Sequence, residues 1–143
     1  MPCKKHMERT KILVVEDDED CRRILVLWLR QLREVTISEA TNGQEALDCI
    51  AHDQPDILFL DLNLPVVDGL EVVRRLRTMP APLSQVPVVA VTAYVLTWDE
   101  QRAIAAGCDE YMTKPIVNPG EIREKFERLL THGRPPSSAR SAW

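Results

Sequence analysis

The run Ile57-Leu58-Phe59-Leu60-Asp61 places four consecutive apolar residues directly before a single carboxylate. A strand covered on both faces is apolar at every position, whereas a strand with one wet face alternates between apolar and polar residues. The run therefore predicts a buried strand of a parallel sheet, with Asp61 at its carboxyl end. Because open α/β sheets bind their ligands at that end of the strands, Asp61 is the first candidate for a functional residue.

On both sides of this run, strand-like and helical segments alternate five times along the chain, which is typical of a parallel sheet with crossover helices. The predicted strands are residues 12–15, 35–40, 57–61, 87–92 and 109–113. The first helix shows an apolar face at helical spacing, made by Cys21, Ile24, Leu25, Trp28, Leu29 and Leu32. We expect an α/β fold of the flavodoxin-like type: a single doubly wound five-stranded parallel sheet in the order 2-1-3-4-5, with five helices.

Short polar residues mark the predicted starts of three helices. Asp18 is placed to cap the first helix, and Asn42 with Glu45 has the spacing of an N-cap and its reciprocal partner. Asn118 followed by Pro119 has the pattern of an N-cap before a proline at the first helical position. These signals fix where the predicted helices begin.

The 143 residues, 45% hydrophobic and 28% charged, are typical of one globular domain. We expect that domain at residues 11–132, after a flexible N-terminus at 1–10. The segment 133–143, rich in proline and serine, has too little apolar surface to form a core and is expected to be disordered.

Charge and hydropathy exclude several classes of protein. The net charge of -4 argues against direct nucleic-acid binding, which requires a basic face. We expect Arg74, Arg75 and Arg77 to form a solvated helical face. No apolar stretch approaches the roughly 20 residues that cross a bilayer, so we expect a cytoplasmic protein without membrane association. The four cysteines lack metal-type spacing and are interpreted as structural or incidental thiols.

Residues just past strands one, three, four and five meet at one edge of such a sheet. They are Glu16 and Asp17, Asp61, Thr92, and Lys114. Three carboxylates in one place repel one another and call for a cation, and hard oxygen ligands with room for water suit Mg²⁺. A divalent ion beside a lysine suits a phosphoryl group, and Asp61 is the best candidate for the nucleophile.

These residues also carry a resemblance to a known family. The chain is similar to the receiver domain of bacterial two-component response regulators, the chemotaxis-regulator-like domains, over residues 11–130. The similar segments are ILVVEDD at 12–18, DLNLP at 61–65 with Asp68-Gly69, Val91-Thr92-Ala93, and Lys114-Pro115. Four motifs in the right order, each at a strand end, make the resemblance specific.

The resemblance implies a role for each site residue. Asp61 would be the phosphoacceptor, taking a phosphoryl group from a histidine kinase or a histidine phosphotransfer protein. Asp17 would bind Mg²⁺ directly, Glu16 would bind it through water, and the backbone carbonyl of Asn63 would complete the protein ligands. Chemistry of this kind is limited to accepting the phosphoryl group and losing it again, so the chain is expected to be a signalling domain rather than an enzyme.

Switching is implied in the same way. Thr92 would be the switch hydroxyl, Lys114 would pair with a phosphoryl oxygen, Tyr111 would be the aromatic switch residue, and the Lys114-Pro115 bond would be cis. Activation would change the surface of the fourth helix, fifth strand and fifth helix, where a downstream effector or a second copy of the chain, forming a homodimer, would bind. That surface comprises residues 95–102, 109–112 and 121–129.

The sequence leaves alternatives open. Only about a dozen residues follow Thr131, too few for an output domain, so we expect a stand-alone regulator. The same residues fit a receiver excised from a hybrid histidine kinase. A phosphohydrolase of the haloacid dehalogenase type also uses an aspartate nucleophile and Mg²⁺, but those enzymes have a second aspartate where this chain has Asn63.

Overall fold

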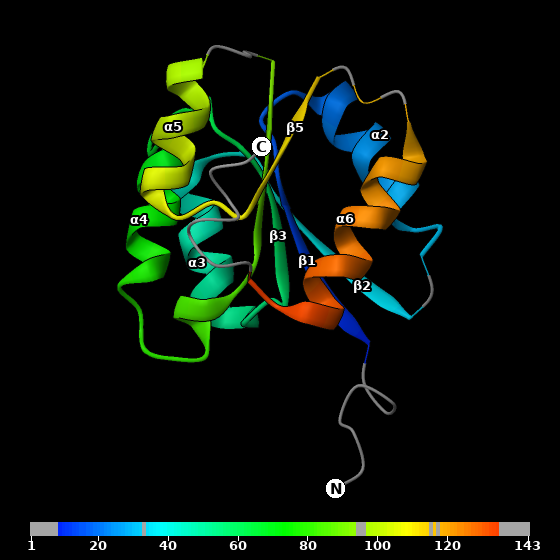
Figure 1. Ribbon diagram of the computed structural model, residues 1–143, viewed down its shortest axis with the longest axis horizontal. Helices are drawn as coiled ribbons and strands as arrows, with labels where there is room; N and C mark the ends of the chain where they lie inside the picture. The colour runs from blue at the N-terminus through cyan, green and yellow to red at the C-terminus, as the bar shows by residue number, and fades with distance from the viewer. Residues whose placement is uncertain (1–8, 33, 94–96, 115, 117, 135–143) are drawn as a thin grey trace, which may run out of the picture.

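A parallel sheet forms the centre of the molecule (Figure 1). The computed structural model describes residues 9–32, 34–93, 97–114, 116 and 118–134. The strands are β1 (Thr10–Val15), β2 (Val35–Ala40), β3 (Ile57–Asp61), β4 (Val88–Thr92) and β5 (Glu110–Thr113). They pair in the order β2-β1-β3-β4-β5, and every pair is parallel. The predicted flavodoxin-like fold and its strand order are confirmed.

Helices cover both faces of the sheet, as Figure 1 shows. The helices α3, α4 and α5 cover one face of the sheet, and α2 and α6 cover the other. Their bounds are α2 (Glu19–Leu29), α3 (Gly43–Asp53), α4 (Gly69–Arg77), α5 (Thr97–Ala106) and α6 (Pro119–His132), with a short 3-10 turn, η1 (Leu83–Gln85), before β4.

Strand β3 shows why its sequence is apolar at every position. Leu58 and Leu60 pack in the core beneath α3, α4 and α5, whereas Ile57 and Phe59 pack in the core beneath α2 and α6. All four side chains are 0% exposed. Burial of each such side chain contributes about 1.5–3 kcal/mol, so a polar substitution at any of the four would weaken one of the two cores.

Helix caps follow the sequence with one difference. The side chains of Asp18, Asn42 and Asn118 accept backbone hydrogen bonds at the starts of α2, α3 and α6, as predicted. The expected return bond from Glu45 to Asn42 is wrong. The Glu45 carboxylate instead accepts from the backbone N–H of Thr41 at 2.8 Å and from the Thr41 hydroxyl at 2.9 Å, one residue earlier.

Two side chains lie elsewhere than predicted. Ile24 is 46% exposed, because the buried face of α2 runs through Leu25, Val26 and Leu29, and Ile24 points to one side of it. Arg77 does not belong to a solvated face. Its side chain is 13% exposed and pairs with the buried carboxylate of Asp109 at 2.9 Å, since the end of α4 lies against the loop before β5.

The exposed remainder of that arginine group behaves as expected. Arg74 and Arg75 are about half exposed and pair with Glu71 on their own helix, at 3.7 and 3.0 Å. Within the described ranges, Cys21, Cys49 and Cys108 are not joined in disulfides.

Several expectations concern residues outside the described ranges. They are residues 1–8 of the N-terminus expected to be flexible at 1–10, the cis bond at Lys114-Pro115, residues 95–96 of the predicted effector surface, and residues 135–143 of the tail expected to be disordered at 133–143. Of the described residues in these two end segments, Thr10 begins β1 and Arg134 pairs with Asp109. Within the part of the chain that the structure describes, no helix is both long enough and apolar enough to span a membrane.

Candidate functional site

Asp61 ends β3 at the middle of the sheet, between β1 and β4. Its side chain is buried, and the loop that follows folds back tightly over it. Gly69 donates its N–H to the carbonyl of Leu62 at 3.0 Å, and a Cβ at Gly69 would lie 2.4 Å from the Asp61 carbonyl oxygen. Only glycine fits at this approach. Asp68 then caps α4 by accepting from the N–H of Glu71.

Each carboxylate oxygen of Asp61 has a hydrogen-bond donor. Oδ1 accepts from the backbone N–H of Asn63 at 3.0 Å, and Oδ2 accepts from Nζ of Lys114 at 3.1 Å. A buried carboxylate is costly unless it is paired in this way. The chain therefore holds Asp61 as an oriented carboxylate rather than as a mobile surface charge.

Glu16 lies next to Asp61 and is 2% exposed. Its Oε1 pairs with Nζ of Lys114, and its Oε2 accepts from the N–H of Asp18 at 3.1 Å. Burial raises the pKa of Glu16 to about 7; the charge of Asp61 acts in the same direction and the hydrogen bond from Lys114 acts against it. Two neighbouring carboxylates thus share one partly buried ammonium.

Lys114 is the cation of the site. Burial by itself lowers the pKa of its ammonium, but the hydrogen bond to Glu16 and the charges of Asp61 and Glu16 outweigh burial, so the pKa is raised. Lys114 therefore stays protonated near neutral pH. A permanent positive charge next to Asp61 suits a site that receives an anion.

The acidic side chains form a cluster that fits a divalent cation. Glu16, Asp17 and Asp61 each offer a carboxylate oxygen, and these oxygens all lie within 4.8 Å of one another. Glu16 and Asp61 are buried, whereas Asp17 is exposed at the mouth of the cluster. Three carboxylates against one lysine leave negative charge in excess, and an all-oxygen set with an open side matches Mg²⁺.

The remaining predicted residues lie along the same edge or just below it. Thr92 ends β4, is 2% exposed, and accepts the backbone N–H of Lys114 at 2.9 Å through its carbonyl. Asn63 is exposed beside Asp61. Tyr111 lies within β5, half-buried, and packs against the core beneath α3, α4 and α5. The structure thus brings together all the residues predicted for the site except Tyr111, which lies three residues before Lys114.

Arg22 is a site neighbour that the sequence patterns did not reveal. Its Nη1 donates to the backbone carbonyl of Glu16 at 3.1 Å, and its Nε donates to Glu39 at 3.0 Å. A signal was present in the sequence, because a cation near the start of a helix opposes the helix dipole and so needs another partner.

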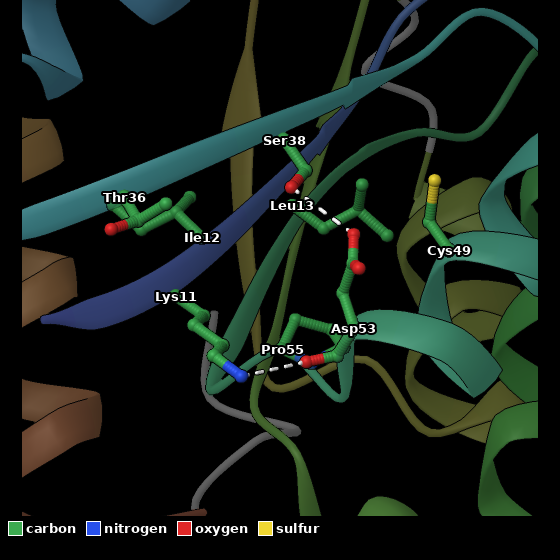
Figure 2. A pocket seen from close by; sticks show the side chains of 8 residues that line it. All are labelled: Lys11, Ile12, Leu13, Thr36, Ser38, Cys49, Asp53 and Pro55. Atoms are coloured by element: carbon green, nitrogen blue, oxygen red, sulfur yellow. Dashed lines mark hydrogen bonds between the residues drawn. The ribbon is translucent and has the colours of Figure 1, made fainter. Parts of the chain in front are cut away.

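A separate cavity of about 150 Å³ lies at the opposite edge of the sheet. Figure 2 shows its lining, with Asp53 at the centre, accepting hydrogen bonds from Ser38 at 3.3 Å and from Lys11 at 3.2 Å. The cavity contains none of the residues predicted for the site. The acidic cluster, not this cavity, is the candidate functional site.

The doubly wound sheet, with an acidic cluster and a lysine at its carboxyl edge, has the arrangement that the sequence resemblance implied. The family model of the response regulator receiver domain matches residues 12–127. The chain belongs to this family of two-component signalling domains. It is therefore a receiver domain rather than a classical enzyme. The family match does not support the alternative of a haloacid dehalogenase-type phosphohydrolase.

Individual relatives agree. The polar-differentiation response regulator DivK of Brucella anthropi is 38% identical over 111 residues, which are 76% of this chain and 86% of DivK. Response regulator MprA of Mycobacterium bovis is 37% identical over 131 residues, which are 92% of this chain but 55% of MprA. The chain thus spans little more than half of that relative.

A solved structure bears on the acidic cluster. The receiver domain of sensor histidine kinase PA1611 from Pseudomonas aeruginosa superposes with a TM-score of 0.78 at 27% identity, covering 86% of this chain and 98% of that one. Its crystal structure has a magnesium ion coordinated in the active site cleft.

Proposed function

We propose that Asp61 is the phosphoacceptor of this receiver and that a histidine kinase or a histidine phosphotransfer protein is the donor. The observation that carries the proposal is the environment of the Asp61 carboxylate: it is buried, it is bound by Lys114 at 3.1 Å, and it lies within 4.8 Å of two further carboxylates. A structural ion pair would need Lys114 and one carboxylate. The second and third carboxylates are explained by a cation.

Mg²⁺ is the proposed cofactor. Glu16, Asp17 and Asp61 would hold it with the backbone carbonyl of Asn63, and the magnesium in the PA1611 receiver supports this choice. When bound, the ion would supply positive charge to the phosphoryl oxygens, which carry the negative charge during transfer.

The transfer itself needs little from the protein beyond position and charge. An oxygen of Asp61 attacks the phosphorus, a P–O bond forms, and the P–N bond to the donor histidine breaks. The electron pair of that bond stays on the imidazole, which takes up a proton. Lys114 keeps its proton throughout and pairs with a phosphoryl oxygen, so the product is an acyl phosphate on Asp61.

Phosphorylation is proposed to act on a pre-existing equilibrium. The new oxygens attract the Thr92 hydroxyl and the Lys114 ammonium, which favours one of two arrangements of Tyr111 and of the α5, β5 and α6 surface. In the described part of this surface, Glu110 pairs with Lys125 at 3.2 Å and with Arg128 at 3.0 Å. An effector protein or a second copy of the chain would bind there.

The proposed folded unit is residues 11–132. The comparisons include a response regulator and a receiver domain of a sensor histidine kinase, so they favour neither setting for this receiver.

Labelling tests the proposal directly. Purified protein with Mg²⁺ and acetyl phosphate should gain one phosphoryl group by intact mass, and Asp61→Asn should gain none. Asp48→Asn, which removes an exposed carboxylate from α3, is the matched control and should label like wild type. Equal labelling of Asp61→Asn would show that the acceptor is another residue. Absence of labelling in wild type would show that the receiver does not accept phosphate from this donor.

A further inference from the structure

Glu16 and Asp17 are adjacent in the sequence and supply two of the three clustered carboxylates, so a single peptide bond joins these two residues. Glu16 leaves the end of β1, and its N–H donates to the carbonyl of Ala40 at 3.0 Å. Its own carbonyl accepts from Arg22 at 3.1 Å. The orientation of this peptide decides where the Asp17 side chain starts, so whatever holds the Glu16 carbonyl also sets the geometry of the cluster.

Arg22 reaches this carbonyl from α2 and is itself held in place. Its Nε donates to Glu39 of β2 at 3.0 Å, and its side chain is 15% exposed. The next residue, Arg23, is 72% exposed and faces Glu19 of the same helix at 3.6 Å. The two neighbouring arginines thus differ sharply: one bridges three elements, and the other lies on the surface.

We propose that Arg22 is a positioning residue for the divalent cation site. Its guanidinium joins Glu39 to the Glu16 carbonyl and thereby fixes the direction of the two carboxylates that follow β1. The role rests on the proposed function, because it concerns the cation that the acidic cluster would hold. Groups that orient metal ligands typically account for 10-fold to 100-fold in metal affinity.

The planar fork of arginine, rather than its charge, is what the geometry uses. Nε and Nη1 point to two acceptors in fixed directions, and a lysine ammonium on a flexible stem cannot reproduce that bridge. Arg22→Lys keeps the charge and loses the bridge, whereas Arg22→Gln loses both. If the bridge matters, the two variants behave alike.

Calorimetric titration with MgCl₂ measures the effect on the folded protein. Arg22→Gln and Arg22→Lys should each bind Mg²⁺ about 10-fold more weakly than wild type. Arg23→Gln, the matched control, should bind like wild type, and Asp17→Asn should show no saturable binding. At saturating Mg²⁺, acetyl phosphate should label both Arg22 variants at the wild-type rate, because the acceptor and Lys114 are intact.

Each other result has a definite meaning. Wild-type affinity in Arg22→Gln, with binding lost in Asp17→Asn, would overturn the role of Arg22 and leave the proposed function standing. Wild-type affinity in Arg22→Lys alone would replace positioning by a simple charge effect. A wild-type protein that binds no Mg²⁺ would overturn both. Should Arg22→Gln fail to fold, Glu39→Ala removes the anchor from outside the site and should weaken Mg²⁺ binding in the same direction.

Discussion

Asp109 is a fully buried carboxylate just before β5, and two arginines bind it. Arg77 reaches it from α4 at 2.9 Å, and Arg134 reaches it from beyond α6 at 2.8 Å. Its Oδ2 also accepts the backbone N–H of Val88 at the start of β4. One side chain therefore ties two helices and two strands together at the amino edge of the sheet.

Arg77 donates several hydrogen bonds in this network. Besides binding Asp109, it donates to the carbonyls of Gly107, Ser84 and Val86, at 2.6–3.1 Å. Removing it leaves a buried carboxylate with one cation fewer and takes a donor away from several carbonyls. Loss of one partner of a buried pair is costly even where the pair itself adds little net stability.

We therefore expect Arg77→Met to lower the free energy of unfolding by about 3 kcal/mol, since the substitution keeps the aliphatic volume and removes the donors. Arg74→Met, on the same helix but exposed, should change it by less than about 0.5 kcal/mol. Urea unfolding followed by circular dichroism measures both. Similar small losses in the two variants would show that Arg77 acts as the solvated residue that its sequence context suggested.

Among the secondary-structure elements, α3 begins with hydrogen bonds to two side-chain acceptors, Asn42 and Glu45. Asn42 accepts from the N–H of Glu45, and Glu45 reaches back to Thr41. The backbone hydrogen bond from Thr41, together with the bond from its hydroxyl, lowers the pKa of Glu45 below its ordinary value. The start of α3 is therefore stabilised by the charged form of this residue.

The sign of the pH dependence follows from that direction. Because the pKa of Glu45 is lower in the folded state than in the unfolded state, its stabilisation is fully present above the unfolded value and is lost as pH falls through the folded value. Glu45→Gln should be less stable than wild type at pH 7, and the difference should shrink as pH falls from about 5 toward 3. Urea midpoints at a series of pH values test this. A difference that stays constant down to pH 3 would show that the charge of Glu45 is not what stabilises the helix start.

At the scale of the whole molecule, the sheet could be predicted from sequence because its interior strands are buried on both faces. The run from Ile57 to Leu60 has no polar position, and such a short apolar run between polar segments is typical of an interior parallel strand. The site residues at the carboxyl edge could be predicted because they directly follow the strand ends. The bridge made by Arg22 could not be predicted in the same way, since one of its acceptors, Glu39, lies on β2, 17 residues away.

Backbone conformations that depend on tertiary contacts could not be predicted from the sequence either. Val66 adopts a φ of 71° in the loop after β3, and nothing in a β-branched residue indicates a left-handed backbone. The sequence around Arg77 predicts an exposed arginine, because its contact with the loop before β5 is formed only in the folded chain. Sequence patterns predict burial and hydrophobic periodicity well. They predict poorly which side chains bridge segments that are distant in the sequence.

The amino and carboxyl edges of the sheet also differ in the balance of their charged side chains. The amino edge has a carboxylate with two arginines at Asp109, whereas the carboxyl edge has Glu16, Asp17 and Asp61 around Lys114. The carboxyl edge thus carries a surplus of negative charge beyond what Lys114 neutralises, and repulsion among its carboxylates opposes folding. A ligand that relieves this repulsion must stabilise the whole domain, because it binds the folded state and not the unfolded chain.

Mg²⁺ should therefore raise the free energy of unfolding by an amount that grows with the logarithm of its free concentration once that concentration exceeds Kd. At a free Mg²⁺ concentration of 100 times Kd, binding adds about 2.7 kcal/mol to the free energy of unfolding. Thermal unfolding in MgCl₂, compared with NaCl at the same ionic strength, measures the gain. Asp17→Asn should show little of it, because the exposed arm of the cluster is lost, whereas Asp48→Asn should respond like wild type. An equal gain in wild type and Asp17→Asn would mean that Mg²⁺ acts as a general salt and that the three carboxylates do not form a cation site.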